Sequence, residues 1–146
     1  MRPSWCLPLV LLIAVGAAGC GSAGGHFNAK GRVVRGGKPY VTQKGEGLRI
    51  FFAPVEARTP GKYDSFAAVY RPDDGTFQVV GKDGTGLPPG QYHVSLQLMK
   101  DKEDLFKGKL MGKQSPYTFD VSRGGEELVI DLDKVDLDAS LTRTKP

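Results

Sequence analysis

The residue with the clearest chemistry in this chain is Cys20. It follows an apolar stretch over residues 7–18 and the small residue Gly19, and a Gly/Ser segment comes directly after it. This layout is typical of a bacterial lipoprotein signal, in which the cysteine takes a lipid such as palmitate. We therefore predict that residues 1–19 are a signal peptide, cleaved between Gly19 and Cys20, and that Cys20 is the lipidation site.

The apolar stretch is too short to remain as a membrane anchor, because a spanning helix needs about 20 apolar residues. Residues 20–27 are expected to form a flexible tether, since Gly/Ser-rich segments behave as coil. Of the two cysteines, Cys6 leaves with the signal peptide and Cys20 is blocked by lipid. No disulfide is then available, although the compartment is an oxidising one.

The predicted location is outside the cytoplasm, in a membrane-anchored lipoprotein. By resemblance to the proteobacterial sorting rule, Gly21 in place of Asp indicates the outer membrane, facing the periplasm. The 20 basic and 16 acidic residues give a net charge of +4, and the charges are interspersed rather than gathered in blocks. This distribution argues against a nucleic-acid partner and allows weak attraction to anionic lipid or to a cell-wall polymer.

Clusters of acidic and histidine side chains offer little further chemistry. Asp131, Asp133, Asp136 and Asp138 supply hard oxygen ligands, but their spacing is not that of a calcium-binding loop. Two interpretations stand for them, and also for Asp73 and Asp74: solvated turns and strand edges, or a weak cation site. His26 and His93 lack the partners that catalysis or zinc binding needs. We predict no catalytic residue, no metal centre and no cofactor, and therefore no enzyme.

Residues 100–113 are the best candidate for an interaction surface. They hold five lysines and three acidic residues, and long loops in compact domains are often functional. A short helix over residues 103–111 is conceivable, although Gly108 weakens it. The candidate interaction loop is Leu105, Phe106, Lys107, Leu110 and Met111. The alternative interpretation is that these apolar residues cover one end of the domain.

The rest of the chain predicts strands separated by turns. Residues 91–99 alternate apolar and polar side chains, which is the period of a half-buried strand. The expected strands are residues 29–34, 48–53, 65–70, 76–80, 91–99, 117–121 and 128–132. They imply an all-β, seven-stranded Greek-key β-sandwich over residues 28–138, with a polar tail over residues 139–146. The expected inward residues are Val33, Leu48, Ile50, Phe52, Phe77, Val79, Tyr92, Val94, Leu96, Leu98, Tyr117, Phe119, Leu128, Ile130 and Leu132.

The order of short motifs resembles a known family. Gly31-x-Val33 precedes Gly37-Lys38-Pro39-Tyr40-Val41, and later come a strand ending in Pro54, Asp74-Gly75-Thr76-Phe77, Pro89-Gly90-Gln91-Tyr92-His93-Val94, Ser115 to Val121 and Gly124-Gly125. This set looks like the transthyretin-like (prealbumin-like) β-sandwich lipoproteins of planctomycete bacteria, often described as carboxypeptidase regulatory-like domains. The resemblance implies a transthyretin-like or immunoglobulin-like sandwich with no established catalytic role.

Gly31 is unusual because glycine in mid-strand loses entropy on folding and packs no side chain. We expect a bulge or a close backbone approach there. The expected function is a non-enzymatic, lipid-anchored envelope lipoprotein whose β-domain has structural or protein-interaction roles. The alternative is a carbohydrate- or cell-wall-binding module. Such a module should show a row of exposed tryptophan or tyrosine side chains, and the only tryptophan, Trp5, lies in the predicted signal peptide.

Overall fold

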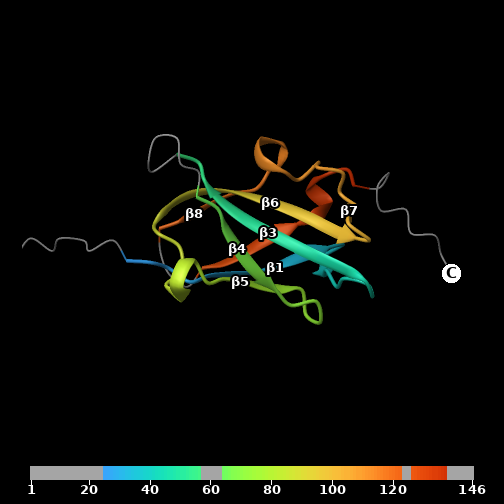
Figure 1. Ribbon diagram of the computed structural model, residues 1–146, viewed down its shortest axis with the longest axis horizontal. Helices are drawn as coiled ribbons and strands as arrows, with labels where there is room; N and C mark the ends of the chain where they lie inside the picture. Colours follow the sequence, from blue (N-terminus) through green and yellow to red (C-terminus); the bar gives the residue numbers. More distant parts are fainter. Residues whose placement is uncertain (1–24, 57–63, 123–125, 138–146) are drawn as a thin grey trace, which may run out of the picture.

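The computed structural model describes residues 25–56, 64–122 and 126–137 (Figure 1). The predicted signal peptide, Cys20, the first part of the tether and the C-terminal tail lie outside these residues. Within them the protein is all-β, with nine strands, three short 3-10 helices and no α-helix. The strands are β1 (Ala29–Arg35), β2 (Lys38–Pro39), β3 (Glu46–Pro54), β4 (Phe66–Tyr70), β5 (Thr76–Val79), β6 (Gly90–Lys100), β7 (Glu103–Asp104), β8 (Thr118–Val121) and β9 (Glu127–Asp131).

Seven of these strands match the seven expected from the sequence to within two residues at each end, which confirms the all-β prediction. The other two, β2 and β7, are two-residue strands in tight hairpins. In β6 the side chains of Tyr92, Val94, Leu96 and Leu98 are all fully buried, as the alternating pattern predicts.

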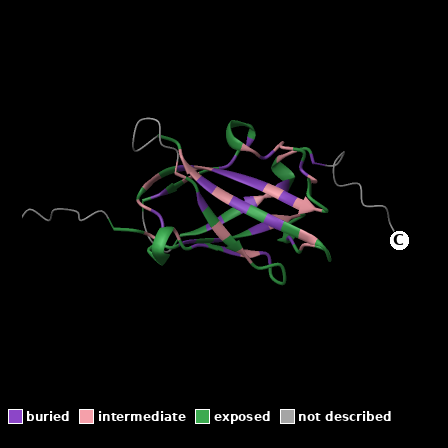
Figure 2. Ribbon diagram, in the orientation of Figure 1, coloured by how far each residue is buried: buried purple, intermediate pink, exposed green. Residues whose placement is uncertain are grey.

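The strands form one curled sheet in the order β2-β1-β5-β4-β3-β6-β7. Two strands lie off this path: β8 pairs antiparallel with β6, and β9 pairs parallel with β1. The curl brings the inner faces of separated strands together, and the rings of Phe52 on β3 and Phe77 on β5 have centroids 6.1 Å apart. The buried side chains alternate with exposed ones along most strands (Figure 2).

The core contains almost all of the residues expected in it. Fourteen of the fifteen predicted inward side chains are buried, and Phe119 is half-buried against the others. Among the described residues, sequence reasoning missed eight further buried apolar side chains, most of them in loops or at strand ends. These are Ala29, Tyr40, Phe66, Leu87, Phe106, Leu110, Val121 and Leu137.

Gly31 marks a close approach between strands, as expected. A Cβ atom at this position would collide with the carbonyl oxygen of Leu128 on the parallel strand β9, and would lie 2.7 Å from Cζ of Phe77. Only glycine lets β1 and β9 pair this closely while Phe77 fills the core beneath them.

The segment after β7 does not form the short helix considered from the sequence. It runs through successive turns to the 3-10 helix η2 (Gly112–Gln114). The carboxylate of Asp104 organises these turns, because its Oδ1 accepts the N–H groups of Leu98 and Phe106, both at 3.1 Å, and its Oδ2 accepts that of Gly108 at 3.0 Å. This local network replaces the helical ladder and aims Phe106 into the core.

Candidate functional site

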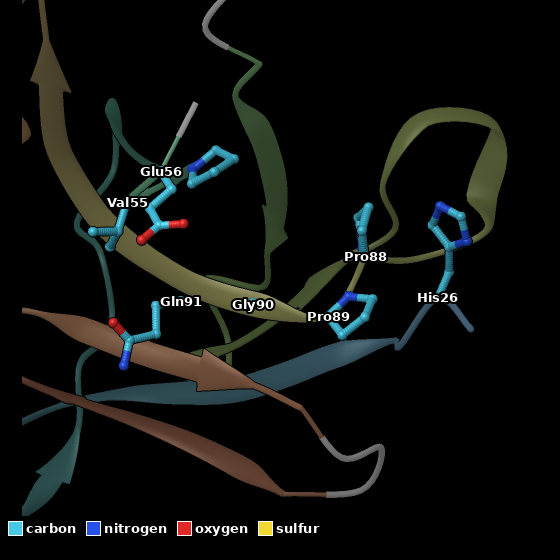
Figure 3. A pocket seen from close by; sticks show the side chains of 8 residues that line it. His26, Val55, Glu56, Pro88, Pro89, Gly90 and Gln91 are labelled. Atoms are coloured by element: carbon cyan, nitrogen blue, oxygen red, sulfur yellow. The ribbon is translucent and has the colours of Figure 1, made fainter. Parts of the chain in front are cut away.

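The end of the domain where the chain enters contains an open hollow of ≈ 660 Å³ (Figure 3). Its lining residues come from three places: the entering chain, the end of β3 with the turn after it, and the loop leading into β6. They are His26, Pro54, Val55, Glu56, Pro88, Pro89, Gly90 and Gln91. Figure 3 shows His26 beside Pro88 and Pro89, with Val55, Glu56 and Gln91 across the hollow from it.

Backbone and tyrosine hydrogen bonds fix the walls of this hollow. Val55 donates its N–H to the carbonyl of Gln91 at 2.9 Å, and Phe27 and Leu87 exchange two bonds of 2.7 Å. The hydroxyl of Tyr92 donates to the carbonyl of Pro88, four residues upstream, at 2.6 Å. Three prolines supply no backbone N–H, so the lining is poor in donors. The hollow is therefore a mostly apolar recess, and His26 and Glu56 are the ionisable residues in its described lining.

A second open hollow, of ≈ 490 Å³, lies on the outer surface over β1 and β5. The charged residues in its described lining are two cations, Lys30 and Arg71, and two acids, Asp74 and Glu127. Mixed charges of this kind select neither an anion nor a cation. Among the described residues, no group of three or more His, Cys, Asp or Glu side chains could hold a metal ion.

Two of the aspartates considered as cation ligands, Asp131 and Asp133, hold backbone groups. Asp131 caps the 3-10 helix η3 (Leu132–Lys134) by accepting the N–H of Asp133 at 3.1 Å. Asp133 accepts the N–H of Gly36 at 2.5 Å and so ties η3 to the β1–β2 hairpin. Asp138 lies outside the described residues. These contacts favour the interpretation of the cluster as structural turns.

Asp74 has a comparable role in the hairpin between β4 and β5. Its Oδ1 accepts the backbone N–H of Thr76 at 2.9 Å and the hydroxyl of Thr76 at 2.6 Å. These bonds, helped by the nearby charge of Arg71, lower the pKa of the Asp74 carboxyl below its usual value. Asp73 is exposed in the same turn. His93 is half-buried on β6, where its Nδ1 lies 3.4 Å from the Thr118 hydroxyl.

The candidate interaction loop does not form the exposed apolar patch that the sequence suggested. Phe106 and Leu110 are fully buried in the core, Leu105 and Met111 are half-buried, and only Lys107 is exposed. The burial of Phe106 and Leu110 favours the alternative that these apolar residues cover one end of the domain, and a partner contact by the loop stays a prediction. The backbone supports this placement, since Leu96 donates its N–H to the carbonyl of Leu110 at 2.9 Å.

Two tyrosine hydroxyls join distant parts of the chain, and sequence reasoning assigned them no partners. The Tyr117 hydroxyl donates to the carbonyl of Asp131 at 2.5 Å, and the Tyr70 hydroxyl donates to the carbonyl of Tyr40. Burial, with a smaller contribution from neighbouring groups, raises the pKa of both phenols to about 12. The phase of Tyr117 in its strand predicted its burial, but nothing in the sequence identified its carbonyl partner.

No helix within the described residues is long and apolar enough to cross a membrane. Comparison of the chain with protein-family models, curated proteins and solved structures returned no match. The functional argument therefore rests on the residues of this chain alone.

Proposed function

We propose that the protein is a non-enzymatic lipoprotein of the bacterial cell envelope, exported and anchored in the outer membrane through an acylated Cys20, where it faces the periplasm. One observation carries the proposal: an apolar stretch, small residues, a single cysteine and a short Gly/Ser segment lead directly into the β-domain, whose first strand begins at Ala29. The domain has a structural role in the envelope or binds another envelope protein.

The polar chemistry of the domain supports a non-catalytic role. The described groups with shifted pKa values are Tyr70, Asp74 and Tyr117. Each of them is bonded to the backbone of a loop or strand end, so each acts on the fold. Perturbed groups that serve catalysis tend to converge in one cleft. Here Tyr70 and Asp74 share the β4–β5 hairpin, whereas Tyr117 stands directly before β8.

Two features support the finer proposal that the fold is a Greek-key sandwich of the transthyretin-like type. First, β6 returns to pair with β3, giving the order β6-β3-β4-β5, which is the strand order of a Greek key. Second, the bond from the Tyr92 hydroxyl back to the carbonyl of Pro88 is that of a tyrosine corner, a feature of Greek-key sandwiches.

The anchor is tested by replacing Cys20 with serine in the full chain and fractionating the cells. We expect Cys20→Ser to lose incorporated palmitate and to leave the membrane fraction. Cys6→Ser is the matched control, because Cys6 is removed with the signal peptide and its loss should change neither readout. Membrane retention of Cys20→Ser with lipid still attached would show that the anchor lies elsewhere.

The partner is tested by crosslinking the anchored protein in intact membranes and identifying what is captured. A specific envelope protein, enriched over a sample of the Cys20→Ser chain, is the expected result. Capture of cell-wall polymer alone would favour the carbohydrate-binding alternative. Capture of neither would remove the interaction role.

A further inference from the structure

The end of the domain at which the chain enters has exposed apolar surface around the hollow. We call this the proximal end and define it as residues 25–28, 54–56 and 80–91. Val55 and Val80 are 41 % and 37 % exposed, and Pro89 is also exposed. Singly exposed valines are ordinary on protein surfaces. Here, however, Val55, Pro88 and Pro89 line one recess together with His26, the second described residue of the chain.

Among the described residues, the proximal end carries three charged side chains, Glu56, Lys82 and Asp83, together with His26. The ammonium of Lys82 donates to Asp64 at 2.8 Å, so these two charges compensate each other. His26 and Glu56 are the described ionisable residues that line the hollow, and Asp83 is exposed beside Lys82. Glu56 and Asp83 therefore leave a small negative charge beside an apolar surface of prolines and valines. Such a surface suits the headgroup boundary of a bilayer, where apolar area is buried at the interface.

The length of chain between Cys20 and the hollow limits how far this end can stand from an anchored lipid. Six residue steps separate Cys20 from His26, and a fully extended chain covers at most about 3.6 Å per residue, or roughly 22 Å. The opposite end is much further away, because the nine residues of β3 extend for about 30 Å at 3.3 Å per residue.

We propose that the proximal end rests against the headgroup region of the membrane that holds Cys20, with its hollow open to the lipid. The opposite end, which carries the β1–β2 hairpin and Val41 just beyond it, is then held away from the membrane and is free for an envelope partner. This orientation rests on the proposed acylation of Cys20 and adds to it the surface that meets the bilayer.

The orientation is tested with two single-cysteine variants of the full, processed lipoprotein. Val55→Cys places a label at the hollow and Val41→Cys places one at the opposite end. The two valines are matched in residue type and exposure, at 41 % and 49 %. With Cys6 removed and Cys20 blocked by lipid, the introduced thiol is the one available to a fluorophore. The labelled proteins are reconstituted into phosphatidylcholine–phosphatidylglycerol vesicles that carry a fluorescence quencher on the lipid headgroup.

Quenching should be several-fold stronger for the Val55 label than for the Val41 label. Equal quenching, or stronger quenching at Val41, would overturn the orientation while leaving the anchor intact. Flotation of the same samples separates the two claims, because a chain that does not float with the vesicles contradicts both the orientation and the acylation. Val80→Cys provides a second label at the proximal end and should be quenched as strongly as Val55→Cys. If one of these two variants folds poorly, the other still tests the orientation.

Discussion

The hydroxyl of Tyr92 should stabilise the domain by joining the loop before β6 to the strand itself. Tyr92 is fully buried, its ring packs against Phe52 and Phe66 with centroids 6.4 and 6.1 Å away, and its hydroxyl donates to Pro88 at 2.6 Å. Tyr92→Phe keeps the ring and removes only the bond. Because the carbonyl of Pro88 then loses this donor in a half-buried place, the free energy of unfolding should fall by about 1–3 kcal/mol.

Urea unfolding of the full chain measures this loss. With a slope of about 1–3 kcal/mol per molar urea for a small domain, the midpoint should move down by roughly 1 M. Tyr92→Leu provides the comparison, because it also removes ring packing and should cost more, in the range of about 3–5 kcal/mol known for large core truncations. The reasoning fails if Tyr92→Phe unfolds at the same midpoint as the parent, or if both variants lose equal stability.

Three further predictions concern the loops and the tyrosines. Asp104→Ala should destabilise the domain by about 2–4 kcal/mol in a urea titration, since three N–H groups lose their acceptor. Replacement of its exposed neighbour, Glu103→Ala, should cost under about 0.5 kcal/mol. Equal losses in the two variants would contradict the role of Asp104 in organising the turns. Lys102 has φ 72° in the two-residue β6–β7 hairpin, so Lys102→Gly should raise the thermal midpoint by relieving about 1 kcal/mol of strain, and a lower midpoint would count against it. Burial raises the folded pKa of Tyr70 and Tyr117 from 10.0 to about 12. The stability that this shift represents is fully present below pH 10 and is lost as the pH rises towards 12. The unfolding midpoint should therefore fall over that interval, and it should fall less in Tyr117→Phe.

The strands could be predicted from the sequence because their side chains alternate with a period of two. In β6 and β9 this alternation and the bounding turns identify both the element and its buried face. The pairing could not be predicted in the same way, because alternation says nothing about which strands are neighbours. Thus the parallel pairing of β9 with β1 came only from the structure, although Gly31 signalled a close approach at that place.

The burial of residues 105–111 could be predicted only as one of two alternatives, because it depends on distant contacts. Phe106 and Leu110 are four residues apart, which is the spacing of one helix face, but no helix forms there. The lysine-rich setting left open whether these side chains contact a partner or cover one end of the domain. Their place in the core is set by the bonds that Asp104 makes to three N–H groups. Such a network depends on how the turn brings those groups together, and residue types alone do not specify it.

The hollow at the proximal end was missed for a related reason. His26, Val55 and Pro89 line it together, although long stretches of sequence separate them. One local feature of the sequence does point to this end of the domain. A tyrosine four residues after a proline, at the start of a strand, can reach back to the proline carbonyl, as the hydroxyl of Tyr92 does to Pro88.

The central claim is that the mature chain begins at an acylated Cys20. Its most direct test is mass spectrometry of the protein extracted from membranes, which gives the intact mass and identifies the N-terminal peptide. The account predicts a chain that starts at Cys20 and carries a mass increment of attached lipid on that residue, released when the acyl groups are hydrolysed. A chain that begins at another residue, or that carries Cys20 as a free thiol in the soluble fraction, would contradict it.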